Sequence, residues 1–224
     1  MSSEDLDELN LRLGLNRARY VCPELEEQID FNVFLYFEED KIVLTDIDGT
    51  ITESDLKGHV SSFLGTTSQH EGVVELLDRL DRRGYRVVYL TARSMAQEED
   101  TKAYLFSTLK NKEGKSLPPG PVIFSPTSFI TGLIAEVVTG SPDVQKTKMI
   151  LELWSTFRSE NRTDINEVIV GGYGNKETDT KAYLQAGLLP HNVFIVNTQG
   201  TRQLYFYLVG NIFSFRRTEK YRNW

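Results

Sequence analysis

The sequence contains a single cysteine, Cys22, in 224 residues. No internal disulfide can form, so a reducing compartment is expected. No apolar run approaches the roughly 18 residues that a membrane-spanning helix needs, and the polar start MSSEDLDELN is unlike a signal peptide. Basic residues are fewer than acidic ones, 25 against 32, and the net charge of −7 argues against a nucleic-acid partner. We therefore expect a cytoplasmic protein with no transmembrane segment.

From about residue 30 onward, strand-like and helix-like patterns follow one another. Short apolar runs typical of strands occupy 31–38, 41–46, 85–91, 121–124, 167–171 and 192–196. A helical pattern at 71–84 ends on Gly84, and another at 94–110 opens with Ser94 and Gln97 in a capping-box arrangement. Strands joined through helices predict an α/β fold with a parallel sheet and right-handed crossovers.

The first 40 residues do not follow this alternation. Their pattern is closer to that of antiparallel strands, so we expect a small N-terminal β appendage packed on the main domain. The predicted organisation is a β segment at 1–40, a catalytic α/β domain at 41–205 and a C-terminal extension at 206–224.

Polar side chains follow the predicted parallel strands where each strand ends. Asp46 and Asp48 stand in D-I-D-G-T after the first, Thr91 follows the second, and Asn175 and Asp179 follow a later one. Ligands of open α/β sheets sit beyond the carboxyl ends of the strands. We therefore expect these side chains to gather in one site.

Two carboxylates one residue apart suit phosphoryl transfer. Asp46 can attack phosphorus to give an aspartyl-phosphate, and Asp48 can act as general acid and then as base. Both are anionic beside a phosphate dianion, so the scheme requires a cation such as Mg²⁺. Asn175 and Asp179 are candidate further ligands, and Lys146 is the leading candidate for a fixed ammonium that balances charge.

Each of these residues taken singly has a simpler structural interpretation. D-x-D-G-T can be a strand-to-turn junction, Thr91 a buried strand-end hydroxyl, and Lys146 a solvated helix charge with Lys148 as its competitor. Asn175 and Asp179 can be a loop residue and a helix cap. Because all four segments occur in order at successive strand ends, we favour the phosphoryl-transfer site.

This order of motifs resembles the haloacid dehalogenase superfamily of phosphotransferases. The resemblance becomes more specific in the catalytic C-terminal region of lipin-type, Mg²⁺-dependent phosphatidate phosphatases. It rests on LNLRLGLN (10–17), DIDGTITESDLKGHV (46–60), GYRVVYLTARS (84–94), LPPGPVIFSP (117–126) and YGNKETD (173–179). The resemblance implies a haloacid dehalogenase-like Rossmannoid sheet with helices on both faces.

The resemblance also implies hydrolysis of phosphatidate to diacylglycerol and phosphate at a membrane surface. It makes Asp46 the nucleophile and Asp48 the acid and base, with Thr91 and Lys146 on the phosphate. Mg²⁺ is expected on Asp46, the Asp48 main-chain oxygen, and Asn175 or Asp179. Arg93 is expected to support the site or reach the lipid headgroup. The expected substrate-binding residues are Gly49, Thr50, Ala92 and Arg93.

Two other functions remain open on the sequence. One is a non-catalytic, lipin-like domain that binds phosphatidate, and the other is a phosphatase of a soluble phosphomonoester, which the acidic charge favours. No amphipathic membrane helix is evident in the first residues. His59 and His70 are expected to be structural residues that help to order the loop over the site. The expected location is cytoplasmic, with transient peripheral association with the endoplasmic reticulum or nuclear envelope. Residues 9–40 are expected to form part of a β-sandwich that a partner chain completes.

Overall fold

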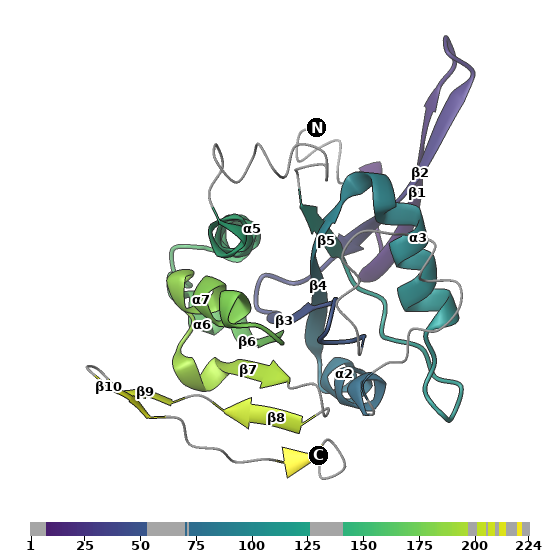
Figure 1. Cartoon of the computed structure of the whole chain (residues 1–224). Coiled ribbons are helices and arrows are strands. Elements are labelled where there is room, and N and C mark those ends of the chain that lie inside the picture. Colours follow the sequence, from purple (N-terminus) through teal and green to yellow (C-terminus); the bar gives the residue numbers. More distant parts are fainter. Residues whose placement is uncertain are drawn as a thin grey trace.

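The structure is a computed structural model that describes residues 8–52, 70, 72–125 and 141–196, and the strand backbone at 201–204, 206–208, 211–213 and 219–220. Its centre is a seven-stranded sheet of order β11-β8-β7-β6-β3-β4-β5 (Figure 1). The strands are β3 (Lys41–Asp46), β4 (Tyr85–Ser94), β5 (Val122–Ser125), β6 (Ile169–Gly174), β7 (Val193–Val196), β8 (Thr201–Leu204) and β11 (Glu219–Lys220).

The five strands from β7 to β5 are parallel, and β8 and β11 are antiparallel to their neighbours. The chain builds β3, β4 and β5 outward on one side, then returns to add β6 and β7 on the other. The topological switch point therefore lies between β3 and β6, where open α/β sheets bind their ligands. The end of β3, with Asp46, is at this point.

Helices cover both faces of the parallel strands. In Figure 1, α5 and α7 lie on one side of β3 and β4, and α2 and α3 lie on the other. The helices are α2 (Val73–Arg82), α3 (Glu98–Ala103), α5 (Pro142–Phe157), α6 (Ile165–Val168) and α7 (Glu177–Gln185), with short turns η2 (Met95–Gln97), η3 (Tyr104–Thr108) and η4 (Pro190–Asn192). The expected α/β fold with a parallel sheet and helices on both faces is confirmed.

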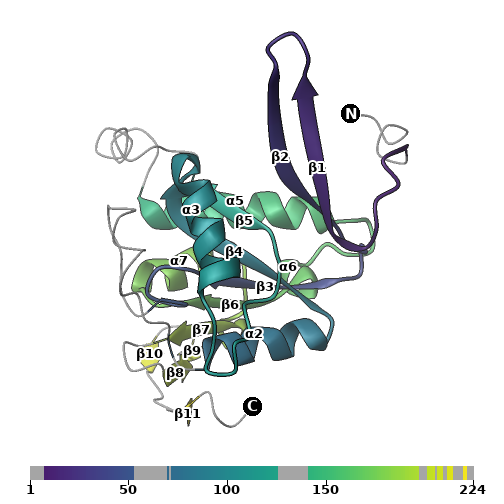
Figure 2. The same ribbon diagram turned by 90° about the vertical axis from the view of Figure 1, so that its right-hand side faces the viewer.

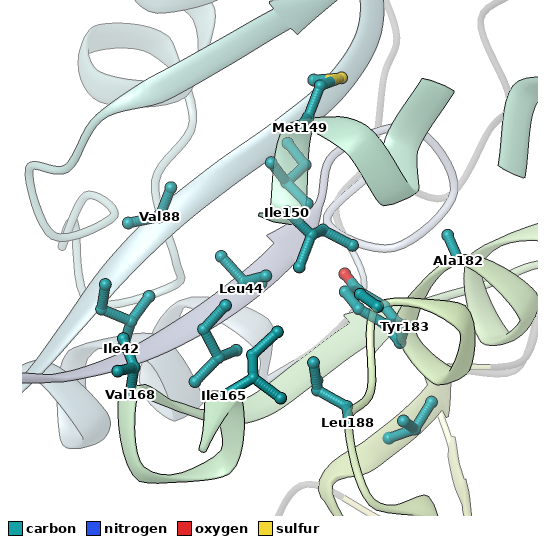
Figure 3. Close-up of a cluster of buried hydrophobic side chains, with 14 of the residues drawn as sticks. Ile42, Leu44, Val88, Met149, Ile150, Ile165, Val168, Ala182, Tyr183 and Leu188 are labelled. Atoms are coloured by element: carbon teal, nitrogen blue, oxygen red, sulfur yellow. The ribbon is translucent and has the colours of Figure 1, made fainter. Parts of the chain in front are cut away.

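Alternation along the strands divides the core into two clusters. On β4, Val88 and Leu90 pack with α5, α6 and α7 (Figure 3), whereas Val87 and Tyr89 pack with α2 and η3. Successive strand side chains point to opposite faces. Both clusters are buried, so the strand ends that carry the polar residues are held from both sides.

One predicted helix differs from the structure. The segment 94–110, expected as a single helix, is broken into η2, α3 and the π-type turn η3. Ser94 is still extended at the end of β4, paired with Ser125 of β5, and its side chain makes no capping hydrogen bond. Ser94 is therefore the last residue of β4, whereas the capping-box pattern assigned it to the start of a helix.

Other boundaries shift by a few residues. The strand expected from 167 begins at Ile169, because Asp164 caps the short α6 by accepting the N–H of Asn166 at 2.9 Å. The expected end of α2 is confirmed, since Gly84 has a φ of +88° just beyond it. Near the C-terminus, β9 (Phe206–Leu208) pairs with β10 (Asn211–Phe213).

The expected N-terminal β appendage is confirmed as a hairpin of β1 (Gly14–Cys22) and β2 (Glu27–Leu35), but the hairpin does not pack along the main domain as expected. Figures 1 and 2 both show it projecting from the body of the protein. Its base is held by Arg162, which donates to the main-chain oxygens of Glu38 and Asp40. Among the described helices, none is long and apolar enough to cross a membrane.

Candidate active site

Asp46 is the last residue of β3, and the chain turns sharply after it. The N–H groups of Thr50, Ile51 and Thr52 all lie within hydrogen-bond distance of the Ile47 oxygen, at 3.3, 3.0 and 3.2 Å. Gly49 has a φ of +86°, a left-handed conformation that glycine adopts without steric cost. The glycine of D-I-D-G-T thus permits the turn that follows Asp46 and carries Asp48.

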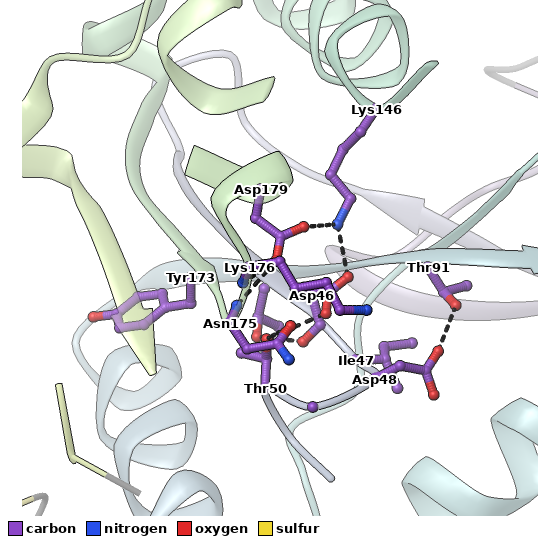
Figure 4. Close-up of polar contacts among 12 residues, drawn as sticks. Asp46, Ile47, Asp48, Thr50, Thr91, Lys146, Tyr173, Asn175, Lys176 and Asp179 are labelled. Atoms are coloured by element: carbon purple, nitrogen blue, oxygen red, sulfur yellow. Dashed lines mark hydrogen bonds and ion pairs between the residues drawn. The ribbon is translucent and has the colours of Figure 1, made fainter. Parts of the chain in front are cut away.

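Lys146 connects three elements at this edge. From the first turns of α5, its Nζ lies 2.7 Å from Asp46 Oδ1 and 2.5 Å from Asp179 Oδ1 (Figure 4). Only 11% of the lysine side chain is exposed. Lys148, its competitor on the sequence, is exposed on the same helix. The structure therefore brings Lys146, and not Lys148, to the carboxylates.

Burial and neighbouring charges shift the pKa values of Asp46 and Lys146 for different reasons. Burial raises the pKa of Asp46 to about 6; Lys146 opposes the rise, and the charges of Asp179 and Asp48 add to it. Burial by itself lowers the pKa of Lys146, but Asp46 and Asp179 outweigh it and raise that pKa above its ordinary value. Lys146 has two anionic neighbours, whereas Asp46 and Asp179 share the charge of Lys146. The ammonium therefore stays charged, and Asp46 remains incompletely compensated.

Asp179 is held by protein donors at both oxygens. Oδ1 accepts from Lys146, and Oδ2 accepts the backbone N–H groups of Asn175 and Lys176, each at 3.0 Å. This is the capping arrangement that begins α7. Gly174 packs so closely that an added Cβ would lie 2.4 Å from the Asp179 Cβ. Asp179 thereby fixes both the lysine and the loop that carries Asn175.

Two hard oxygen atoms meet at the Thr50 hydroxyl. Thr50 Oγ1 lies 3.2 Å from Asp46 Oδ2 and 3.4 Å from Asn175 Oδ1. Within the described ranges, no group of three or more His, Cys, Asp or Glu side chains is placed to hold a metal ion. A site with one carboxylate, one amide oxygen and several waters still fits Mg²⁺, which commonly uses few protein ligands.

The charge balance also fits a cation. The carboxylates of Asp46 and Asp179 pair with Lys146, and that of Asp48 pairs with Arg93. A phosphate dianion that enters this group would bring an excess of two negative charges. A divalent cation offsets that excess.

Asp48 points away from this group, toward Thr91 (Figure 4). The Thr91 hydroxyl donates to Asp48 Oδ2 at 3.3 Å, and the Arg93 guanidinium donates to both carboxylate oxygens, at 3.0 and 2.5 Å. The Arg93 N–H also donates to Thr91 Oγ1 at 3.1 Å. The second acid of D-I-D-G-T is therefore oriented by β4, not by β3.

The expected substrate-binding residues differ in how exposed they are and in which groups they contact. Gly49 and Thr50 are buried in the turn, where the Gly49 N–H donates to Thr52 Oγ1 at 3.1 Å. Ala92 is exposed beside Thr91. Arg93 is directed at Asp48.

Sequence reasoning anticipated one supporting residue and missed another. His70, expected to order the loop near the site, is buried, and its Nε2 lies 3.1 Å from the Gly49 oxygen. His59, expected to act similarly, lies outside the described residues. Thr101, which bonds Arg93 at 3.3 Å, was not anticipated. The i, i+2 spacing of Thr91 and Arg93 indicates that these two share one face of a strand, but no local pattern indicates Thr101.

Comparison with known proteins gives consistent relatives. The family model described as LNS2 (Lipin/Ned1/Smp2) matches residues 1–212. "Phosphatidic acid phosphohydrolase 1" of Saccharomyces cerevisiae is 35% identical over 89% of this chain and 24% of its own length. "Nuclear elongation and deformation protein 1" of Schizosaccharomyces pombe is 34% identical over 89% and 30%. "Phosphatidate phosphatase LPIN3" of Homo sapiens is 32% identical over 89% and 23%.

Among solved structures, a D,D-heptose 1.7-bisphosphate phosphatase from B. bronchiseptica, complexed with magnesium and phosphate, aligns with a TM-score of 0.48 at 14% identity. The alignment covers 66% of this chain and 78% of that one. The chain spans less than a third of the length of the three curated relatives above. The family match covers nearly all of the sequence, and the chain therefore belongs to the LNS2 (Lipin/Ned1/Smp2) family.

Proposed function

We propose that this chain is a Mg²⁺-dependent phosphatidate phosphatase, which hydrolyses phosphatidate to diacylglycerol and phosphate through an aspartyl-phosphate on Asp46. One observation carries the proposal: Lys146 bonds Asp46 at the topological switch point, with Asp48 two residues further along the same turn. The phosphatidate phosphatase names of two of the relatives above support the choice of substrate.

In the first half of the reaction, Asp46 Oδ1 attacks phosphorus and the bond from phosphorus to the glycerol oxygen breaks. Lys146 lies 2.7 Å from Oδ1, where it can also meet a phosphate oxygen and balance its charge. Asp48 gives a proton to the departing glycerol oxygen, so that diacylglycerol leaves as a neutral alcohol. The products of this step are diacylglycerol and the aspartyl-phosphate.

In the second half, water attacks the phosphorus of the aspartyl-phosphate. Asp48, now deprotonated, takes a proton from that water, and the bond from phosphorus to Asp46 breaks. Inorganic phosphate leaves, and Asp46 regains its carboxylate. Because Asp48 receives the proton that it gave earlier, its protonation is restored after one turnover.

The residues that would hold Mg²⁺ are Asp46, through Oδ2, and Asn175, through Oδ1, with the main-chain oxygen of Asp48 completing the protein ligands. Both side-chain atoms face the Thr50 hydroxyl. An ion bound there would supply positive charge beside the transferring phosphate. Asp179 belongs to the support of this group, since both of its oxygens already accept from protein donors.

We further propose that the protein works from the cytoplasmic side at the surface of an internal membrane, the endoplasmic reticulum or nuclear envelope. The proposal follows from the substrate, which resides in membranes. Association would be peripheral and transient. Fractionation of cells that express the whole protein, with and without a wash at high salt, tests this location.

The hairpin supports a proposal about a partner chain. Ala18, Tyr20, Ile29 and Phe31 share one face of it, and the exposed fractions of Tyr20, Ile29 and Phe31 are 62%, 62% and 46%. A free two-stranded ribbon with such a face is marginal in water. We propose that further strands, from a partner chain, cover this face and complete a β-sandwich.

The test is phosphate release from phosphatidate in mixed micelles with Mg²⁺, beside p-nitrophenyl phosphate, for the native chain and Asp46→Asn. Release from the lipid that is lost in Asp46→Asn and in chelator supports the proposal. Release from the aryl ester alone would indicate a phosphatase of soluble phosphomonoesters. Binding to phosphatidate vesicles without any release would indicate a lipin-like binding domain and would refute catalysis.

A further inference from the structure

The Arg93 side chain lies at the catalytic edge but is directed at protein groups. Nε donates to Asp48 Oδ2 at 3.0 Å, Nη2 donates to Asp48 Oδ1 at 2.5 Å, and Nη1 donates to the Thr101 hydroxyl of α3 at 3.3 Å. Only 6% of the side chain is exposed. A planar guanidinium bonded along two of its edges has one orientation, and it imposes that orientation on the carboxylate.

The backbone of β4 explains how Arg93 reaches Asp48. From Leu90 to Ser94, β4 advances four residues while β5 advances two, from Ile123 to Ser125. Such an irregularity beside an active site redirects side chains. Thr91 and Arg93 are both buried, and the residue between them is exposed, so both face the turn that carries Asp48. The irregular end of β4 therefore places Thr91 and Arg93 where both bind the Asp48 carboxylate.

We propose that Arg93 is a positioning residue for Asp48. Its guanidinium holds the carboxylate that exchanges the proton with the leaving group, and Thr101 holds the guanidinium. This role rests on the proposed phosphatase function, and of the two roles expected for Arg93 it specifies support of the site in place of contact with the substrate. The fork of the guanidinium is already bonded to Asp48, and 6% exposure leaves little of the side chain for a ligand from solvent.

The basicity of the leaving group distinguishes this positioning role from phosphate binding and from a purely structural role. An alkyl phosphate such as dioctanoyl phosphatidate expels a strongly basic oxygen, so its cleavage depends on a well-placed general acid. p-Nitrophenyl phosphate expels a weakly basic phenolate and depends on the acid much less. A residue that grips the phosphate affects both esters alike, because both carry the same group. A residue that only stabilises the fold also affects both alike.

The experiment measures kcat and KM for both esters with saturating Mg²⁺, for the native chain and for Arg93→Lys, Thr101→Val and Arg86→Gln. Arg86 is the matched control because it lies on the same strand and pairs with Asp40 at 2.8 Å, away from the site. We expect Arg93→Lys to lower kcat/KM for the alkyl ester at least about tenfold more than for the aryl ester, because kcat/KM covers only the steps up to departure of the leaving group. Thr101→Val should shift the ratio in the same direction by less, and Arg86→Gln should leave it unchanged.

A double-mutant cycle with Asp48→Asn completes the test. If Arg93 acts through Asp48, Arg93→Lys should cause no further selective loss on the alkyl ester once Asp48 is replaced. An unchanged ratio of the two esters, with KM raised for both, would assign Arg93 to the phosphate and overturn the proposal. Equal loss of kcat/KM on both esters, with KM unchanged, would reduce the pair to a structural role. Inactivity of the native chain on both esters would refute the proposed function itself.

If Arg93→Lys does not fold, as judged by circular dichroism, Thr101→Val carries the test. That variant removes one hydrogen bond from a fully buried hydroxyl and keeps the shape of the side chain. A selective loss on the alkyl ester would support the positioning role. The native ratio in a folded Thr101→Val protein would overturn the positioning role.

Discussion

The Nζ of Lys146 lies 2.7 Å from Oδ1 of Asp46, although one hundred residues separate them in the sequence. The contact joins the first turns of α5 to the end of β3, and the same nitrogen reaches Asp179 at the start of α7. One cation therefore serves two carboxylates in a site from which solvent is largely excluded. Both the charge of the site and its geometry depend on this atom.

Replacement of Lys146 by methionine should abolish activity and destabilise the protein. Asp46 and Asp179 would face each other without a cation, and breaking a buried ion pair typically costs about 3–5 kcal/mol. Lys148→Met is the control, because that side chain is exposed on the same helix. Phosphate release and urea unfolding measure the two effects. Equal behaviour of the two variants would contradict the role of Lys146.

Replacement of Gly174 by alanine should reduce activity about tenfold or more while the sheet stays folded. The added Cβ would lie 2.4 Å from the Asp179 Cβ, so the start of α7 must move and carry Asp179 away from Lys146. Gly171→Ala, on the same strand, is a close control, because its added Cβ meets nothing nearer than 3.5 Å. Steady-state kinetics of the two variants decide, and similar kinetics would refute the argument.

The gathering of site residues could be predicted because it depends only on topology. Asp46, Thr91 and Asn175 lie near the carboxyl ends of parallel strands, and these ends meet at one edge whatever the strand order. The strand order itself, which places β3 beside β6, is not encoded in local periodicity. The choice of Lys146 over Lys148 depends on how α5 rotates against the sheet, which its apolar pattern alone did not define.

The fork from Arg93 to Asp48 could not be predicted from local pattern. It depends on the irregular pairing of β4 with β5, which continues the strand through Ser94 and delays the helix to Glu98. The capping-box pattern at Ser94 favoured a helix, and tertiary pairing overrode it. The same competition explains the wrong prediction of one continuous helix at 94–110.

We expect His70 to stabilise the turn that carries Asp48. Its Nε2 lies 3.1 Å from the Gly49 oxygen, so His70→Ala leaves a buried carbonyl without this partner, at a cost of about 1–3 kcal/mol. We expect lower kcat and lower thermal stability. His70→Gln, which keeps an N–H donor, should recover part of both, and His191→Ala, at an exposed position, should change neither. Failure of the glutamine variant to recover anything would argue against the hydrogen bond.

The exposed apolar face of the hairpin should make the isolated chain associate. Lysine at Ile29 and Phe31 together should reduce light scattering at high protein concentration, because both side chains lie on that face. Hydrolysis of p-nitrophenyl phosphate should be unchanged, since the hairpin contributes no residue to the site. Arg19→Gln, on the opposite face in an exposed ion pair with Asp30, is the control. Unchanged scattering of the double variant would contradict the expectation.

Asp46 should make the metal-free protein less stable as the pH rises. Its pKa, 3.8 when unfolded, is raised to about 6 in the fold, first of all by burial. A raised carboxyl pKa favours the folded state below the unfolded value, and that contribution is lost as the pH rises through the folded value. The shift corresponds to at most about 3 kcal/mol, lost between about pH 4 and pH 7. Lys146 stays charged throughout this window because its pKa is raised.

The check is urea unfolding in chelator at several pH values for the native chain and Asp46→Asn. The native chain should lose stability relative to the variant from pH 4 to pH 7, because asparagine carries no proton to lose. Addition of Mg²⁺ at pH 7 should stabilise the native chain more than the variant, since the ion binds the ionised carboxylate. Parallel pH profiles of the native chain and Asp46→Asn in chelator would contradict the prediction, because they would show that ionisation of Asp46 does not destabilise the fold. A site whose nucleophile is costly to ionise without its cation would be stable at neutral pH chiefly when that cation is bound.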